Sequence, residues 1–208
     1  GEAANTVGAQ LVRAQPVADG LNAAEMLQGK VKGLLLLHTE PEFDSVLGAR
    51  AAQQLENVDM VVTMSPFKSN MAFSDVLLPV SPFTETSGSF VNTEGRVQGF
   101  HAVVKPAGET RPAWKVLRVL GNMLDLSGFD MESSHAVLTS IDGVRDDHEG
   151  VVDHLLDNAT DATITVNQAQ AAPVVASIYQ LDGIVRRAPS LQATADARAA
   201  RQHQGGNA

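Results

Sequence analysis

The chain has 208 residues, 44% of them hydrophobic, with 24 acidic and 15 basic side chains that give a formal net charge of -9. The apolar fraction is enough for one buried core, whereas the negative charge disfavours nucleic acid and anionic lipid as partners. The absence of cysteine excludes Cys-ligated iron–sulfur clusters from this chain, and the longest apolar run, Leu34 to Leu37, is too short to span a membrane.

The first predicted elements form one strand between two helices. Asn22 is predicted to cap a short helix over residues 23–30. Residues 33–38 are continuously apolar up to the final histidine, which predicts a parallel strand buried on both faces. Asp44 is then predicted to cap a helix that runs to about Asn57.

Two further strands are predicted at residues 59–64 and 76–80. Pro79 cannot donate a ladder hydrogen bond, so the third strand lies at an edge or its pairing ends there. Glycines then punctuate residues 87–95, which predicts an ordered loop or a short hairpin instead of another crossover.

The remaining pattern is mainly helical. After a linker at residues 105–112, apolar spacing predicts an amphipathic helix over residues 114–124. Ser133 or Ser134 is predicted to cap another helix, and Ser190 a final Ala-rich one.

Together these elements predict an α/β fold, namely a layered, Rossmann-like, mostly parallel sheet with flanking helices plus a helical or irregular C-terminal extension. We divide the chain into an α/β domain at residues 1–130 and an acidic helical extension with a C-terminal tail at residues 131–208. The first residues include neither Met nor a signal-peptide pattern. We therefore expect a piece of a larger protein.

Two polar groups outside the Gly-rich stretch favour a structural interpretation over a functional one. The acidic segment Asp146–Asp157 matches neither a two-His zinc helix nor a calcium loop, so a solvated face is preferred to a cation site. His38 lies at the C-terminal end of the first predicted strand, where ligand crevices lie, but a hydrogen-bonded core histidine is the more frequent outcome there. We predict no catalytic and no metal-binding residue.

The Gly-rich turn after the third strand gathers the polar side chains of Glu85, Asn92, Glu94 and Arg96. In a functional interpretation, Arg96 and the backbone amides around Gly95 donate to an anionic cofactor, and Asn92 adds its amide. In a structural interpretation, Arg96 pairs with Glu85 or Glu94. Asn92 then takes a left-handed turn conformation, and the set only holds the loop. The residues alone leave both interpretations open.

The stretch Ser74–Gln98, SDVLLPVSPFTETSGSFVNTEGRVQ, resembles a segment of molybdopterin oxidoreductases that reads A-D-V-x-L-P and then E-x-x-G-T/S-F-x-N-x-E-G-R-x-Q. The matching positions are Asp75, Leu78, Pro79, Glu85, Gly88, Phe90, Asn92, Glu94, Gly95, Arg96 and Gln98. In relatives that carry the cofactor, the resemblance places this loop near the pterin.

A second stretch, Ile178–Thr194, IYQLDGIVRRAPSLQAT, is similar to the C-terminal end of the large iron–sulfur subunit of bacterial NADH-quinone oxidoreductases, respiratory complex I. This resemblance implies a molybdopterin-oxidoreductase-like domain without the molybdenum cofactor. It implies a retained cofactor loop that binds no cofactor and consists of Glu85, Asn92, Glu94, Gly95 and Arg96. It also implies 2Fe-2S and 4Fe-4S clusters in an N-terminal part of the parent subunit that is absent from this sequence.

The resemblance implies a non-catalytic structural part of that large iron–sulfur subunit, which supports electron transfer from NADH to quinone by clusters located elsewhere in a proton-translocating NADH dehydrogenase. The expected partners are other peripheral-arm subunits on the cytoplasmic side of the bacterial inner membrane, without direct membrane insertion and without nucleic acid. The alternative is the C-terminal fragment of a true molybdopterin-dependent oxidoreductase acting on a small molecule such as formate or nitrate. A third hypothesis is a free-standing anion-binding module that uses Arg96.

Overall fold

The computed structural model describes residues 5–17, 19–141 and 177–199. Three strands, β1 (Gly33–Leu37), β2 (Met60–Ser65) and β3 (Val76–Pro79), form a parallel sheet in that order. Two more, β4 (Gly88–Val91) and β5 (Val97–Phe100), form an antiparallel hairpin. The predicted α/β class with a parallel sheet is therefore confirmed, and the Gly-rich stretch takes the hairpin form.

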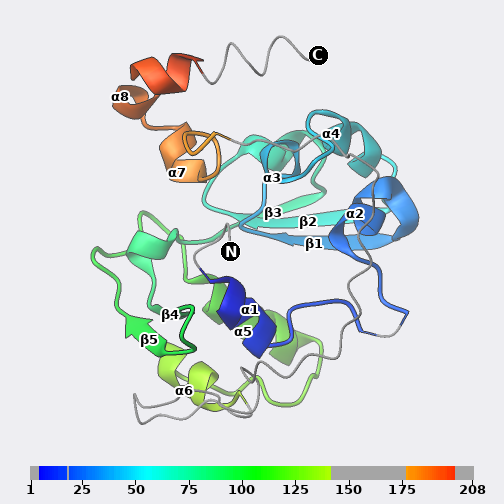
Figure 1. Cartoon of the computed structure of the whole chain (residues 1–208). Helices are drawn as coiled ribbons and strands as arrows, with labels where there is room; N and C mark the ends of the chain where they lie inside the picture. Colours follow the sequence, from blue (N-terminus) through cyan, green and yellow to red (C-terminus); the bar gives the residue numbers. More distant parts are fainter. Residues whose placement is uncertain (1–4, 18, 142–176, 200–208) are drawn as a thin grey trace, which may run out of the picture.

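Helices surround the sheet and the hairpin (Figure 1). They are α1 (Thr6–Leu11), α2 (Ala23–Glu25), α3 (Pro41–Asp44), α4 (Arg50–Leu55), α5 (Ala113–Met123), α6 (Ser134–Thr139), α7 (Gly183–Arg186) and α8 (Pro189–Gln192). A π-helix, η1 (Met26–Lys30), continues α2, and η2 (Ser69–Ala72) and η3 (Phe83–Glu85) are single 3-10 turns. In Figure 1, α3 and α4 lie above the sheet, and α1, α5 and the hairpin lie below it.

Two predicted helix caps are confirmed by their hydrogen bonds. The side chain of Asn22 accepts from the backbone N–H of Glu25 at 3.0 Å, and the Glu25 carboxylate accepts from the N–H of Asn22 at 2.9 Å. This reciprocal pair is a capping box. Ser133 caps α6 by accepting from the N–H of Ala136 at 3.0 Å.

The single helix predicted from Asp44 to about Asn57 is wrong, because the structure has two short helices, α3 and α4, separated by a turn. Gly48 in this turn has a φ of +55°, a left-handed conformation that a continuous right-handed helix does not contain. Asp44 does not act as an N-cap. It ends α3, and its carboxylate accepts a hydrogen bond from the backbone N–H of Glu40 at 2.7 Å.

The predicted cap at Ser190 is also wrong. Helix α8 begins one residue earlier, at Pro189, a residue type that is favoured in the first helical turn because it has no N–H to satisfy. The chain leaves the helix at Ala193 and re-enters it at Ala195. Thr194 caps this second helical turn by accepting from the N–H of Ala197 at 3.3 Å.

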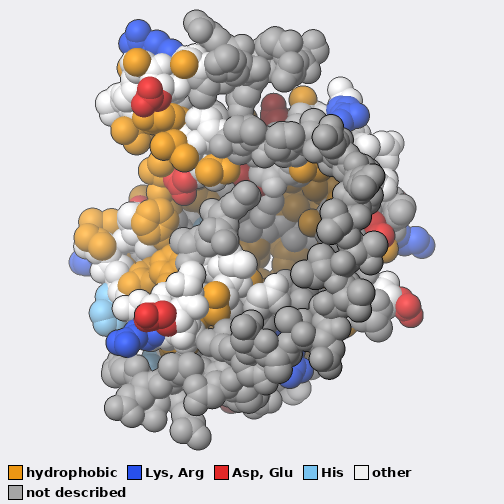
Figure 2. Space-filling view, viewed as in Figure 1, with side chains coloured by type: hydrophobic (Ala, Val, Ile, Leu, Met, Phe, Trp, Pro, Cys, Tyr) orange, Lys and Arg blue, Asp and Glu red, His pale blue; other side chains and the backbone are white. Residues whose placement is uncertain are grey.

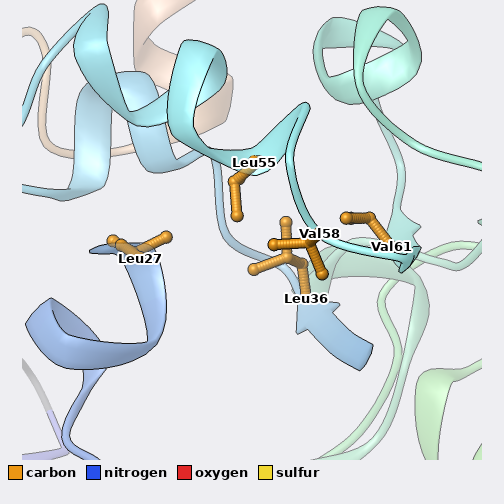
Figure 3. Packing of buried hydrophobic residues seen from close by; sticks show 5 residues of the cluster. All are labelled: Leu27, Leu36, Leu55, Val58 and Val61. Atoms are coloured by element: carbon orange, nitrogen blue, oxygen red, sulfur yellow. The ribbon is translucent and has the colours of Figure 1, made fainter. Parts of the chain in front are cut away.

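The main hydrophobic core lies between the sheet and the helices on one face of it. Figure 3 shows the buried cluster, which consists of Leu27, Leu36, Leu55, Val58 and Val61. Leu55 and Val61 are completely buried. Burial of each such side chain contributes about 1.5–3 kcal/mol to folding, so this face holds the first strand in place.

The prediction that the first strand is buried on both faces is wrong for β1. Leu36 points into the core, whereas Leu35 and Leu37 are 45% and 40% exposed on the other face. Among the described residues, strand β1 lies at one edge of the sheet and pairs only with β2. The central strand β2 comes closer to the predicted burial, since Met64 on the same face as Leu37 is fully buried.

The other edge of the sheet and the hairpin follow the sequence more closely. Pro79 is the last residue of the edge strand β3 and pairs with Ser65, which agrees with the predicted edge or end of pairing. Helix α1 packs on the hairpin through a small cluster that includes Leu11 and Val91. The side chain of Asn5 accepts from the N–H of Val91 at 2.8 Å, which fixes the helix to β4.

Candidate functional site

A cavity of about 740 Å³ lies at the carboxyl end of the parallel strands. Leu37 and Ser65, the last residues of β1 and β2, line it on one side. Residues 86–90 before and within β4 line it on another, and residues 181–184 of the C-terminal segment line it on a third. Ligands of open α/β sheets bind at this end of the strands, so the cavity is the candidate site.

A buried carboxylate, Glu40, dominates the polar contacts beside this cavity. Glu40 is only 3% exposed and follows β1 by three residues. Its two carboxylate oxygens accept hydrogen bonds from the guanidinium groups of Arg186 and Arg187 and from the hydroxyl of Ser69. Burial alone would raise the pKa of Glu40, but the hydrogen bonds from Arg187, Ser69 and Arg186 outweigh it and lower the pKa to about 2. The group is therefore a carboxylate.

Both arginines are held by further contacts on the sheet side. Arg186 also donates to the carboxylate of Asp44 at 3.0 Å, and its guanidinium lies 4.7 Å from the ring centre of Phe43. The guanidinium of Arg187 lies 3.8 Å from the ring centre of Phe67. Cation–π contacts of this kind add to the ion pairs. Each arginine thus has both a carboxylate and an aromatic partner.

Local hydrogen bonds shape the C-terminal segment, residues 177–192, that presents the two arginines. Asp182 caps α7 by accepting from the backbone N–H groups of Ile184 and Val185 at 2.8 and 3.0 Å. The side-chain amide of Gln192 donates to the carbonyls of Tyr179 and Val185, each at 2.9 Å. These bonds close the segment on itself, so that α7 directs Arg186 and Arg187 toward the strand ends.

His38 lines the cavity and differs from the predicted core histidine. Its side chain is exposed, and in the part of the chain that the structure describes no hydrogen bond to its imidazole is found. Partial burial in the cavity lowers the pKa of His38, which favours the neutral imidazole near pH 7. Its φ of +51° is a left-handed conformation that turns the chain sharply as β1 ends.

The Gly-rich loop is held mainly by Asn92. The side-chain carbonyl oxygen of Asn92 accepts from the backbone N–H groups of Glu94 and Arg96 at 3.1 and 2.8 Å. Asn92 does not take the left-handed conformation that the structural interpretation assigned to it; Gly95 does, with a φ of +82°. The carboxylate of Glu85 accepts from the N–H of Ala107 at 2.9 Å.

The ion pair that the structural interpretation gave to Arg96 does not form among the described residues. Among the described residues, no salt bridge joins Arg96 to Glu85 or Glu94, and its side chain is exposed. None of the five loop residues predicted from the sequence lines the cavity, whereas their neighbours at 86–90 do. The hairpin therefore contributes residues to the cavity, but they are not the residues predicted from the sequence.

Sequence reasoning missed the residues with the densest set of contacts at the site, Glu40, Arg186 and Arg187. The signals that could have indicated them are two adjacent arginines after a capped turn and an acidic residue just beyond a parallel strand. In the chain, Glu40 lies 146 positions from Arg186 and 147 positions from Arg187. Without the fold, nothing in the sequence pairs them.

A metal centre and a membrane-spanning helix are two features that the described residues lack. Within residues 5–17, 19–141 and 177–199, no group of three or more His, Asp or Glu side chains could hold a metal ion. The acidic segment Asp146–Asp157 lies outside the described residues. None of the described helices is long and apolar enough to cross a membrane.

Comparison with known proteins gives two findings. A family model described as molybdopterin oxidoreductase matches residues 1–123. Three similar proteins of Staphylococcus aureus bear the name "Putative formate dehydrogenase". The protein of strain bovine RF122 / ET3-1 is 42% identical to this chain over 81 residues. The proteins of strains USA300 and NCTC 8325 / PS 47 are 37% identical to it over 81 residues. Each match covers 38% of this chain and 8% of the relative. The C-terminal segment with Arg186 and Arg187 lies beyond the family match.

Proposed function

The chain belongs to the molybdopterin oxidoreductase family, and from that membership we propose that it is a non-catalytic, structural part of the large iron–sulfur subunit of an NADH-quinone oxidoreductase. In this role it holds the cluster-bearing portion of the subunit in position for electron transfer from NADH to quinone. The similarity of Ile178–Thr194 to the C-terminal end of that subunit supports the choice. Because this chain has no cysteine, the proposal assigns the 2Fe-2S and 4Fe-4S clusters to another part of the parent subunit.

The observation that carries the structural role is that polar side chains of the Gly-rich loop form hydrogen bonds within the chain. The side chain of Asn92 is engaged by two backbone N–H groups of its own loop, and that of Glu85 by the N–H of Ala107. These side-chain oxygens act as acceptors within the chain, and the backbone N–H groups of Glu94 and Arg96 are used by Asn92, so the contacts maintain the shape of the loop. The loop is then a retained cofactor loop that serves the fold.

The proposed partners are the other peripheral-arm subunits of the complex, on the cytoplasmic side of the bacterial inner membrane. Large hydrophobic side chains are exposed on the C-terminal segment and near the hairpin: Leu181, Ile184, Leu191, Phe83 and Phe90. Figure 2 shows hydrophobic side chains gathered along the side of the molecule that carries α7, α8 and the hairpin in Figure 1. Exposed apolar patches of this kind mark protein–protein contacts.

The proposed function is tested on the assembled complex. We expect Asn92→Ala in the parent subunit to lower the yield of assembled complex, while NADH oxidation per assembled complex stays unchanged, because the loop does no chemistry. Glu94→Ala is the matched control, since the contact of its carboxylate with Asn92 is long, 3.4 Å. A normal yield of complex with lost NADH-quinone activity would contradict the structural role.

A second candidate function is part of a molybdopterin-dependent formate dehydrogenase. The names of the similar Staphylococcus aureus proteins favour it. Molybdenum and pterin analysis of the purified full-length parent distinguishes the two candidates. Stoichiometric molybdenum and pterin with formate oxidation would establish the second candidate, and their absence together with NADH-quinone activity would support the first.

A further inference from the structure

The cations at the carboxyl end of the sheet are already neutralised by the chain itself. The charged residues that line the cavity are Glu40, Asp44, Asp182 and Arg186. Three carboxylates and one guanidinium give a formal charge of -2, or -1 when Arg187, bound to Glu40, is added. An anionic ligand would therefore face a net negative surface.

The arginines are also difficult to release. The side chain of Arg186 is 7% exposed and is bound to Glu40 and Asp44. Arg187 donates to both oxygens of Glu40, a forked contact that an arginine makes more strongly than a single bond. Freeing either guanidinium for another anion would leave the Glu40 carboxylate, 3% exposed, without its partners, at a large cost.

From these contacts we propose that the C-terminal segment, residues 177–192, is an internal plug that docks through Arg186 and Arg187 onto Glu40, pairs the cationic groups at the carboxyl end of the sheet and so disfavours anionic ligands in the cavity that it lines. The residues present here do not fit an anionic cofactor, because no uncompensated guanidinium or ammonium group lines the cavity among the described residues. The plug deepens the structural role proposed above and rests on it, since a cavity without an unpaired cationic group suits a domain that binds no cofactor.

The backbone of the segment is adapted to this close contact. A Cβ added at Gly183 would lie 2.8 Å from a ring carbon of Phe67 and 3.4 Å from a guanidinium nitrogen of Arg187. A contact of 2.8 Å is shorter than van der Waals packing allows. Glycine at this position thus lets α7 approach the loop after β2 closely enough for Arg187 to reach both Phe67 and Glu40.

Hydrogen exchange on the full chain tests whether the segment docks on the residues that follow β1. In the R186A/R187A variant we expect the amides of residues 38–44 to exchange about tenfold faster or more, because charge-assisted bonds hold the segment in place. Exchange of Leu34 to Leu36 inside β1 should stay unchanged, which shows that the sheet is intact. R198A is the matched control, since this arginine is exposed on the last helical turn. If R186A/R187A does not fold, R187K is used; it keeps the charge but loses the forked contact, and faster exchange is expected at the same amides.

Titration with inorganic pyrophosphate tests whether the cavity excludes anionic ligands. The single tryptophan, Trp114, lines the cavity and reports on its occupation by fluorescence. We expect no saturable change in the wild-type chain. Saturable binding of pyrophosphate with altered exchange at residues 182–187 would overturn the plug. Unchanged exchange at residues 38–44 in R186A/R187A would also overturn it. Neither result would affect the proposed function. Molybdenum and pterin in the parent would instead overturn the proposed function.

Discussion

Replacing Glu40 with Gln removes the negative charge that binds both arginines and preserves the shape of the side chain. The pKa of Glu40 falls from 4.5 to about 2 in the folded chain, and at 1.36 kcal/mol per pKa unit this difference corresponds to about 3 kcal/mol of stability. Breaking one partner of a buried ion pair typically costs about 3–5 kcal/mol, which is in the same range. We therefore expect Glu40→Gln to be about 3 kcal/mol less stable than wild type at pH 7.

The same pKa predicts how the difference depends on pH. Because the pKa is lower in the folded state, the stabilisation is complete above the unfolded value of about 4.5 and is lost as the pH falls toward 2. Urea unfolding followed by circular dichroism between pH 7 and pH 2 should show the two proteins converging only below pH 4.5. Glu42→Gln is the control, since this side chain is exposed on α3, the helix that Glu40 precedes. A gap between wild type and Glu40→Gln that stays constant down to pH 2 would refute the role of the carboxylate.

Five further substitutions test three other parts of the structure by urea unfolding. Asn92→Ala should cost about 1 kcal/mol, because two backbone N–H groups lose their acceptor, whereas Arg96→Ala should stay within about 0.5 kcal/mol, as is usual for an exposed side chain; equal effects would contradict the assignment of the loop to Asn92. Gly183→Ala should destabilise the chain by about 1 kcal/mol or more through the short contact of its new methyl group, and a neutral result would mean that the C-terminal segment is not closely docked. Leu36→Ala should cost about 2–5 kcal/mol and Leu35→Ala much less, since only Leu36 faces the core; equal losses would show that both faces of β1 are buried.

Features that depend on neighbouring residues were predictable from the sequence. The caps at Asn22 and Ser133 involve residues three positions away, so the local pattern contains all of the information. The hairpin and the edge position of Pro79 follow similarly from the backbone limits of glycine and proline. The sheet was predictable because hydrophobic runs separated by a helix or a polar connection favour parallel strands.

Features that depend on distant partners were not predictable. Leu35 and Leu36 have the same side chain, and only the position of the helices decides which of them is buried. The ion pairs of Glu40 join it to residues of the C-terminal segment 146 and 147 positions away, and no period or spacing indicates such a pair. For the loop, the structural interpretation relied on an ion pair of Arg96, whereas the contacts within the turn are made by Asn92, whose side-chain oxygen accepts from two backbone amides.

The one-sided pairing of β1 has a consequence for handling this chain in isolation. In the part of the chain that the structure describes, the strand has a hydrogen-bonding neighbour on one side only, and its sequence, GLLLL, contains no charge and no proline. Exposed strand edges without such protection associate with other strands and lead to aggregation. We therefore expect β1 to promote association of the isolated chain at high concentration, and a lysine in place of the exposed Leu35 to reduce it.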